Sequence, residues 1–544
     1  MTKQGKPGST RETRAETPRE RARAFLRVAH LYRLGALPTE QPHPATRRLS
    51  RWALSDLPQA VSVLKTIDLH ALGTLERYAQ DIGRLADRIE ATLTGGKRVF
   101  LCGCGATGRL SLSLEFLWRQ AHGGSEQVRS FMAGGDVALV EALEGFEDHP
   151  DYGARHLQEM GFVEGDLLIG CTEGGETPYV IGATEEAARL SSNPPCFLYC
   201  NADPVLVRHV ERFRRVHDNR DIDKICLSVG PMALAGSTRM QASTVLQLAV
   251  GAALLHPGEP AGELIAGFRR RVEETDLSFL VDFIEKESDI YSTGHHVTYR
   301  VRDYGITVLT DTTERAPTFS LVAFDQLKER RSRYSLCYVS LEGAGSSADA
   351  WARLLNRAPR PLDWPDVDPR TTSEYLQGFD FSLHAVERRR RQIPDKIHHE
   401  FVIRRSRDAI RWRLGDLHHD VRVGGLRDLF QHLLLKQMLN IHSTLVMGRL
   451  GRYENNLMTW VSPTNGKLVD RAARYVNRLL LGAGRTGTQY DDIVRRLFTE
   501  MDAIEPGESV VLRTYRSLLK QGQARPSRKM RPVLPRRSPL HRAS

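Results

Sequence analysis

Short segments that are apolar at nearly every position recur through the first half of the chain, each followed by a turn and a helical stretch. They lie at 98–102, 127–132, 167–171, 195–200 and 224–227. Strands of this kind are covered on both faces and are typical of parallel sheets with helical connections. We therefore expect a doubly wound α/β domain, whose turns gather at the carboxyl ends of the strands.

A second α/β pattern begins near residue 275. Strands are expected at 296–301, 307–310 and 335–339. The polar stretch 357–400 then interrupts the pattern, and we interpret its charge run, 387–391, as the solvated face of a helix. The sequence thus predicts two similar halves, each a flavodoxin-like parallel sheet flanked by helices, followed by C-terminal helices.

Five segments are expected along the chain. They are a disordered basic tail, a first α/β domain with an N-terminal arm and helices, a second α/β domain, a C-terminal helical region and a second disordered basic tail, at 1–30, 31–270, 271–455, 456–520 and 521–544. Proline and threonine make residues 31–50 read as an extended arm. Apolar periodicity predicts helices over 51–94 and 426–450.

The net charge of +11 is located at the two ends of the chain. Residues 1–30 hold eight basic and three acidic residues, and residues 521–544 hold seven basic and no acidic ones. The two ends together therefore carry more positive charge than the net charge of the whole chain, and the residues between them are close to neutral. A nucleic-acid-binding protein carries its charge on a folded face, so we expect no specific nucleic-acid partner.

Neither a membrane span nor a metal site is expected. No run of about 18 apolar residues exists, and the basic N-terminus lacks the apolar core of a secretory signal, so we expect a cytoplasmic protein. The seven cysteines form no CxxC pair and lie mostly in apolar runs, which favours buried reduced thiols. The histidine pairs at 295–296, 398–399 and 418–419 lack spaced ligand partners, so we interpret them as structural.

Three turns could carry chemistry. Each follows an expected strand and precedes a helix, at 103–109, 170–178 and 230–240. A glycine-rich turn of this kind presents backbone N–H groups at the positive end of a helix and attracts a phosphate. Singly, each turn could be an ordinary helix cap. Their occurrence at the strand ends of one domain favours a common ligand crevice.

The first turn also satisfies GxGxxG, the dinucleotide fingerprint. That fingerprint needs an acidic residue about 20 positions further on, whereas Asp136 lies 28 residues beyond Gly108. A nicotinamide-dependent oxidoreductase therefore rests on this motif alone. We favour Thr107 as a hydroxyl donor to a single phosphate group, and we expect no cofactor.

These turns resemble the SIS (sugar isomerase) domain family, in the branch of the N-acetylmuramic acid 6-phosphate etherases and the glucokinase regulatory protein. The arm at 34–46, the phosphate loop at 105–110, the stretches 133–136 and 144–148, and the motifs at 177–182 and 236–240 carry the resemblance. It implies the fold given above and a sugar phosphate ligand.

The second half resembles another SIS domain only in part. The stretch 311–319 is similar to the family's D-A-S-E-C-P-P-T-F, whose Glu is the catalytic acid, and Glu314 occupies that position. Residues 302–305 stand in place of the phosphate loop without its small hydroxyl residues. The first half keeps the loop and Glu147, the family's base position. The resemblance therefore implies a fused pseudo-dimer with one composite site.

The site that the resemblance implies has Glu147 as base and Glu314 as acid. The residues expected to bind the sugar phosphate are Gly105, Thr107, Gly108, Arg109, Thr172, Gly174, Ser237, Thr238 and Lys436. Departures from the etherase pattern, such as Gly174 for Ser and Glu176 for Arg, favour a sensor of carbohydrate metabolism that resembles the glucokinase regulatory protein, with a sugar kinase as its partner. The alternative is an etherase-like lyase that releases D-lactate.

Overall fold

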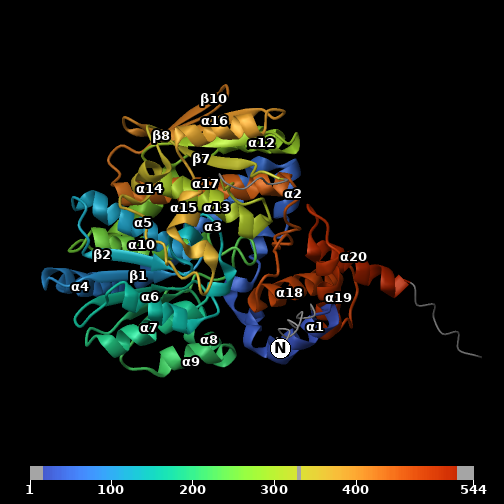
Figure 1. The fold of residues 1–544 in the computed structure, drawn as a ribbon, viewed down its shortest axis with the longest axis horizontal. Helices are drawn as coiled ribbons and strands as arrows, with labels where there is room; N and C mark the ends of the chain where they lie inside the picture. The colour runs from blue at the N-terminus through green and yellow to red at the C-terminus, as the bar shows by residue number, and fades with distance from the viewer. Residues whose placement is uncertain (1–15, 327–332, 524–544) are drawn as a thin grey trace, which may run out of the picture.

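The computed structural model describes residues 16–326 and 333–523, and it contains two α/β halves that face each other across a layer of helices (Figure 1). The first sheet is parallel throughout, in the order β2-β1-β3-β4-β5. Its strands are β1 (Val99–Gly103), β2 (Val128–Met132), β3 (Leu167–Cys171), β4 (Cys196–Tyr199) and β5 (Asp223–Cys226). These confirm the five expected strands. Because β2 and β3 lie on opposite sides of β1, a ligand crevice is expected between the ends of β1 and β3.

Helices cover both faces of this sheet. They are α4 (Ala79–Thr94), α5 (Ala106–Ala121), α6 (Pro150–Glu159), α7 (Pro178–Leu190), α8 (Asp203–His209), α9 (Glu211–Asp218) and α10 (Gln241–Leu255). In Figure 1, α6 to α9 lie on the side away from the second half, whereas α5 and α10 lie on the side facing it. The doubly wound arrangement of the first half is therefore confirmed.

The second sheet is parallel over three strands, as expected, and it also has two antiparallel strands that were not expected. Its order is β10-β9-β8-β6-β7. The strands are β6 (His296–Val301), β7 (Cys337–Leu341), β8 (His398–Ser406), β9 (Ala409–Leu414) and β10 (Leu417–Arg422). The parallel strands β7-β6-β8 repeat the order β2-β1-β3 of the first half, and β9 and β10 then continue as antiparallel strands.

The strand expected at 307–310 is wrong, because these residues lie in α13 (Gly305–Phe319). β-Branched residues favoured a strand, but the threonine hydroxyls are satisfied inside the helix. Thr310 Oγ1 donates to the Ile306 carbonyl at 2.8 Å and Thr312 Oγ1 to the Val308 carbonyl at 2.9 Å. This bond to the preceding turn makes threonine compatible with a buried helix. Helix α13 follows β6 as α5 follows β1.

The halves meet through α5 and α10 on one side and α13 and α17 on the other. The other helices of the second half are α11 (Ala261–Glu274), α12 (Leu280–Ser292), α14 (Ser347–Leu355), α15 (Ser373–Gln377), α16 (Leu383–Gln392) and α17 (Asp428–Arg449). Helix α17 confirms the expected apolar helix and is buried along nearly all of its length. Buried ion pairs cross the interface, such as Arg239–Asp311 at 2.8 Å and Arg357–Asp136 at 2.6 Å.

The charge run 387–391 lies in α16 and faces solvent except at Arg389. That side chain is buried, and its Nε lies 2.8 Å from an Asp325 carboxylate oxygen. Its guanidinium donates to the Ser335 carbonyl at 2.7 Å and lies 4.3 Å from the centre of the Tyr338 ring. The interpretation of the run as a solvated face is therefore wrong at this one position, which points inward.

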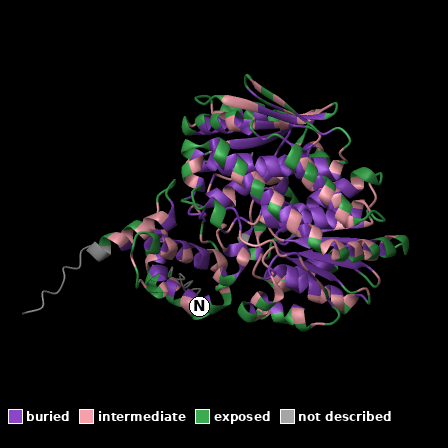
Figure 2. Cartoon of the chain, turned by 180° about the vertical axis from the view of Figure 1, so that it is seen from behind, coloured by how far each residue is buried: buried purple, intermediate pink, exposed green. Residues whose placement is uncertain are grey.

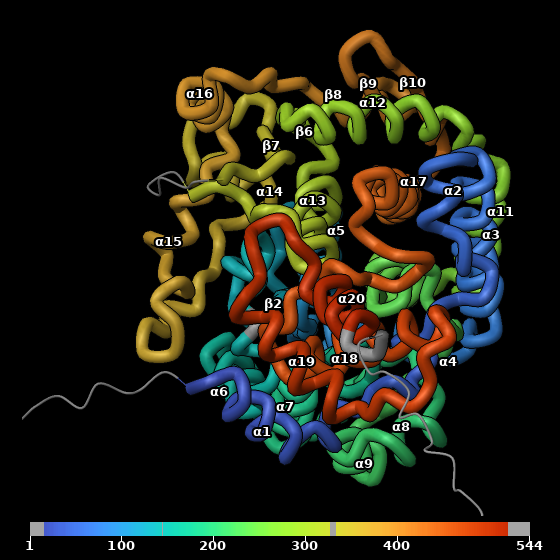
Figure 3. Tube along the Cα trace, turned by 90° about the vertical axis from the view of Figure 1, so that its right-hand side faces the viewer, coloured from blue at the N-terminus to red at the C-terminus, as the bar shows by residue number. Residues whose placement is uncertain are grey.

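A smaller lobe joins the two ends of the described chain (Figures 1 and 3). It consists of α1 (Pro18–Val28), α18 (Gly466–Gly482), α19 (Tyr490–Asp502) and α20 (Val510–Gln523). Helix α1 packs on α19, where the Phe25 and Phe498 rings are 6.2 Å apart. The disorder expected as far as residue 30 is thus wrong for α1, and the tail expected from 521 overlaps the end of α20. The tail residues 1–15 and 524–544 lie outside the described residues.

The expectation of an extended arm over 31–50 is wrong. The arm forms short 3₁₀ turns before α2 (Leu49–Ser55) and α3 (Leu57–Leu75). Its Leu37 and Glu40 side chains are buried. The Met232 N–H donates to the Gln41 carbonyl and the His43 N–H to the Met232 carbonyl, so the arm is fastened to the first half. The helices α2 and α3 reach across to pack on α17.

Buried residues fill the two sheets and the helical layer between them (Figure 2). None of the seven cysteines forms a disulfide, and five of them are buried, as expected. Within residues 16–326 and 333–523, no group of three metal-ligating side chains occurs. Over the same residues, no helix combines the length and the apolar character that a membrane crossing requires.

Candidate active site

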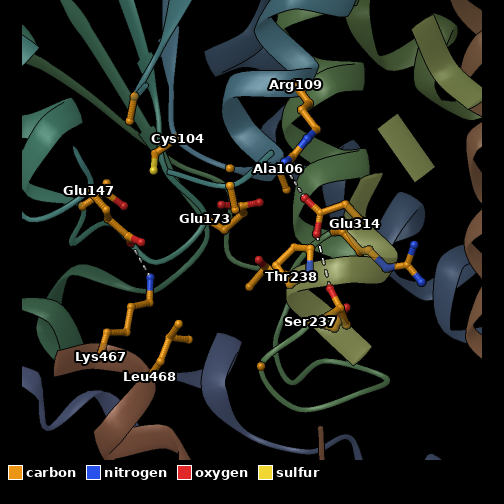
Figure 4. A pocket seen from close by; sticks show the side chains of 18 of the residues that line it. Cys104, Ala106, Arg109, Glu147, Glu173, Ser237, Thr238, Glu314, Lys467 and Leu468 are labelled. Carbon is orange, nitrogen blue, oxygen red and sulfur yellow. Dashed lines mark hydrogen bonds and ion pairs between the residues drawn. The ribbon is translucent and has the colours of Figure 1, made fainter. Parts of the chain in front are cut away.

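A polar cavity of about 170 Å³ lies where the first half, the second half and the C-terminal lobe meet (Figure 4). The ends of β1 and β3 open into it, and α13 and α18 close it from the other sides. The charged side chains that line it are Arg109, Glu147, Glu173, Arg239, Glu314, Lys467 and Arg471. Three carboxyl groups and four cationic groups thus share one small space.

The turn after β1 brings the N-terminus of α5 to the cavity. Gly105 caps the helix with φ +55°, a conformation that side chains rarely adopt. A Cβ on Gly103 would lie 2.3 Å from the Thr107 backbone, so the turn needs glycine there too. The Thr107 hydroxyl accepts from the Cys104 N–H and donates to the Cys104 carbonyl, both at 2.9 Å. The hydroxyl therefore fixes the turn and does not line the cavity.

Arg109 and Glu314 join the two halves across the cavity wall. The Arg109 guanidinium forms an ion pair with the Glu314 carboxylate and donates to the Ala138 carbonyl at 3.0 Å. Glu314 also accepts from the Thr318 hydroxyl at 3.3 Å. Both side chains are almost fully buried, so this pair is held in a low-dielectric setting where a charge needs its partner.

Glu147 lies on the opposite side of the cavity and pairs with a residue of the C-terminal lobe (Figure 4). Lys467 Nζ is 2.9 Å from a Glu147 oxygen and 2.6 Å from a Glu176 oxygen. Burial lowers the pKa of Lys467, but these two carboxylates outweigh it and hold that pKa well above its usual range. Lys467 therefore stays charged and links α18 to the first half.

The loop before α10 forms the floor of the cavity with Ser237 and Thr238. The Ser237 hydroxyl is buried and has no hydrogen-bond partner among the described residues. Arg239 turns away into a bonded cluster with Asp311, Ser443 and Thr444. A buried hydroxyl without a partner is costly, and a ligand in the cavity would supply one.

Glu173 stands between Glu147 and Glu314 in the view of Figure 4. It follows β3 by two residues and accepts a hydrogen bond from the Ser243 hydroxyl at 2.8 Å. In the described part of the chain, Glu147 and Glu314 each have an ion-pair partner, whereas Glu173 has this hydrogen bond and no ion pair. Burial raises the pKa of Glu173.

Six of the eleven predicted site residues line the cavity, and five do not. Those at the cavity are Gly105, Arg109, Glu147, Ser237, Thr238 and Glu314, and those outside its lining are Thr107, Gly108, Thr172, Gly174 and Lys436.

The five residues outside the lining make structural contacts in the segments that surround the cavity. The Thr172 and Thr177 hydroxyls bond to each other at 2.9 Å, and the Gly174 carbonyl accepts from Asn201. A Cβ on Gly108 would lie 2.5 Å from Met132, so this glycine allows α5 to approach the strand end. Lys436 Nζ donates to the Arg239 carbonyl at 2.7 Å and thereby holds the loop that carries Ser237 and Thr238.

Four charged residues of the cavity were not predicted as site residues. They are Glu173, Arg239, Lys467 and Arg471. Glu173 and Arg239 belong to turns that the sequence singles out, so their position after a strand was a usable signal. Lys467 and Arg471 come from α18, and only the packing of the C-terminal lobe brings them to the cavity.

The fold and the cavity define a two-half α/β protein with a polar cavity that both halves line. The family model for the glucokinase regulatory protein N-terminal SIS domain matches residues 81–188. N-acetylmuramic acid 6-phosphate etherase of Gloeobacter violaceus is 31% identical over 259 residues, which cover 46% of this chain and 80% of that protein. The etherase of Synechococcus elongatus is 32% identical over 259 residues, 46% of this chain and 79% of that protein.

Among solved structures, tagatose-6-phosphate ketose/aldose isomerase from Escherichia coli aligns with 71% of this chain and 92% of its own, at 12% identity and a TM-score of 0.38. This structural similarity is low. The family assignment rests on the sequence identity to the etherases. This chain belongs to the SIS-domain family, in the branch of the N-acetylmuramic acid 6-phosphate etherases and the glucokinase regulatory protein.

Proposed function

We propose that the chain is a carbon–oxygen lyase of the etherase type, which cleaves the lactyl ether of N-acetylmuramic acid 6-phosphate. The observation that carries the proposal is the pair of carboxylates, Glu147 and Glu314, which reach one cavity from different halves of the chain. The names of the relatives point to the same reaction. These comparisons favour the lyase over the regulator that the sequence analysis placed first.

The reaction needs a base and an acid on different sides of the sugar ring. Glu147 would take the proton from C2, and the electrons of that bond would form the C2–C3 double bond. The C3–O bond to lactate would break, and Glu314 would give its proton to the departing oxygen. Addition of water at C3 would then return the proton to Glu314, and Glu147 would protonate C2.

The ion pairs suit these two roles at different stages. Lys467 lies 2.9 Å from Glu147 and places a positive charge beside the group that would act as the base. Arg109 forms the corresponding ion pair with Glu314. An anionic substrate that takes Arg109 as its own partner would free Glu314 to hold a proton. The phosphate would lie at the turn of α5 beside Ser237 and Thr238.

The experiment is incubation with N-acetylmuramic acid 6-phosphate in deuterated water, with lactate release and deuterium at C2 measured together. Wild type should release lactate and incorporate deuterium. Glu147→Gln should lose both signals, whereas Glu314→Gln should lose lactate release by at least 100-fold. The matched control is Glu90→Gln, at an exposed position on α4. Full activity in both cavity variants would refute the assignment.

Sugar-phosphate binding without turnover is the second candidate. It is favoured by the match of residues 81–188 to the regulatory protein's domain model and by the ion pairs that occupy both carboxylates. In that case wild type would give no lactate and no deuterium, while a hexose 6-phosphate would raise the melting temperature by binding the native state. The sugar-kinase partner suggested by the resemblance receives no support from these comparisons.

A further inference from the structure

Glu173 is the cavity carboxyl that the proposed acid–base pair does not use. It lines the cavity with Glu147 and Glu314 and lies at the carboxyl end of β3, next in the sheet to β1. The gap between those two strand ends is the point where the sheet order reverses, and ligands of open α/β sheets bind there. Glu173 therefore occupies the place where an anionic group of the ligand is expected.

The cavity beside Glu173 has space for an anion, and within the described residues no cation forms an ion pair with this carboxyl. The turn at Cys104 and Gly105 lines the same cavity, as does Ser237, whose hydroxyl has no hydrogen-bond partner in the part of the chain that the structure describes. Glu173 itself has the Ser243 hydroxyl at 2.8 Å. The cations Arg109 and Lys467 are already shared with Glu314 and Glu147.

An ionised carboxylate and a phosphate dianion in this space would repel each other. Like charges within about 4–6 Å disfavour the charged form of a carboxyl group, as does removal from water. A proton shared between the two groups removes the repulsion and adds a hydrogen bond. Burial raises the pKa of Glu173 and thereby favours the protonated carboxyl that such sharing requires.

We propose that Glu173 is a ligand-contacting carboxyl that binds the anionic group of the sugar ligand through a shared proton, so that one proton is taken up with each ligand. The proposal rests on the proposed sugar-phosphate site, but it holds whether the sugar is turned over or only bound. It makes affinity fall as pH rises, by up to tenfold per pH unit where a full proton is taken up.

Other titratable groups face Glu173 and must be separated from it. They are Lys467 on α18, Glu314 on α13, Lys436 on α17, Cys171 at the end of β3 and Cys200 after β4. Asp148, beside Glu147 and Glu176, has a pKa raised to about 6 by burial and by those two carboxylates. These other groups are the same in wild type and in a variant that changes Glu173 alone, so their contributions cancel when the proton uptake of the two proteins is compared.

The test is titration calorimetry of the full chain with N-acetylglucosamine 6-phosphate at pH 8, in buffers of different ionisation enthalpy, which gives the protons taken up per ligand. Wild type should take up close to one proton and Glu173→Gln close to none. Glutamine does not titrate, so the affinity of the variant should no longer change with pH. Glu90→Gln is the control for an exposed glutamate.

N-acetylglucosamine 6-sulfate separates the protein's proton from the ligand's. A phosphate monoester has its own pKa near 6, whereas a sulfate ester does not titrate in this range. Proton uptake that persists with the sulfate in wild type, and is absent in Glu173→Gln, supports the proposal. Equal uptake in wild type and variant overturns it.

A second variant covers the case in which Glu173→Gln does not fold. Ser243→Ala removes a hydrogen bond that favours the ionised carboxylate, so the decline of affinity should move to higher pH. An unchanged profile in that variant overturns the proposal. Absence of binding of either ester to wild type would instead contradict the proposed sugar-phosphate site itself.

Discussion

Glu40 fastens the N-terminal arm to the C-terminal lobe, and its replacement should loosen α18. The carboxylate is 4% exposed and lies 2.5 Å from Arg471 Nη2 and 2.9 Å from Arg474 Nη2. Burial would raise its pKa, but the two guanidinium groups outweigh burial and lower the pKa from 4.5 to about 2. A shift of that size corresponds to about 3 kcal/mol of stability at neutral pH.

Glu40→Gln should therefore destabilise the docked lobe by about 3 kcal/mol, because two buried arginines lose their counter-charge. The measurement is hydrogen–deuterium exchange of the α18 amides at pH 7. Exchange that requires undocking should accelerate on the order of 100-fold. The matched control is Glu274→Gln, at an exposed position on α11, which should leave α18 unchanged.

The pH dependence gives the sign of the effect. Because the folded-state pKa of Glu40 is lowered, its contribution is present above the ordinary value of 4.5 and is lost as the pH falls through about 2. The difference between wild type and Glu40→Gln should be full at pH 7 and small near pH 2. Exchange rates in α18 that agree within threefold at pH 7 would refute the reasoning.

Three further predictions concern packing, a buried charge and the cavity floor. Gly182→Ala would place a Cβ 1.9 Å from the Pro150 carbonyl oxygen and should lower the melting temperature by more than about 10 °C. Gly267→Ala, which has open space on α11, should stabilise the protein by up to about 1 kcal/mol, and equal melting temperatures of the two variants would contradict this. Arg389→Ala should cost about 3–5 kcal/mol in urea unfolding and the exposed neighbour Arg390→Ala less than about 0.5, and similar costs would show that the ion pair with Asp325 is not needed. Ser237→Ala should weaken N-acetylglucosamine 6-phosphate binding about 5–10-fold with little change in melting temperature, and an unchanged affinity would place the phosphate elsewhere.

The parallel strands β1 to β7 could be predicted because their sequences are rich in apolar residues. The parallel strand β8 was missed, because its sequence is mostly polar. The antiparallel strands β9 and β10 were missed, although Ile410, Trp412 and Leu414 are buried and alternate with two arginines. That alternation is typical of a strand with one solvated face. The sequence of β9 therefore contains a local signal for a strand.

The meeting of Glu147 and Glu314 at one cavity could be predicted from the resemblance, since the two residues belong to family motifs in different halves. The behaviour of individual side chains could not. Thr107 has the residue type of a phosphate ligand, but its hydroxyl is consumed by the Cys104 backbone. Lys467 reaches Glu147 across 320 residues of sequence, through docking of a lobe that no local pattern specifies.

The Arg109–Glu314 contact joins the two halves within a single polypeptide. In an arrangement of two separate subunits, such a site exists only while the subunits are associated, and its occupancy follows protein concentration. Here the partners are covalently tethered, so dilution cannot separate them. The tether also frees the halves from symmetry, since a substitution on one side of the interface has no mirrored copy on the other. A carboxyl such as Glu173 could therefore enter one half without being imposed on the other.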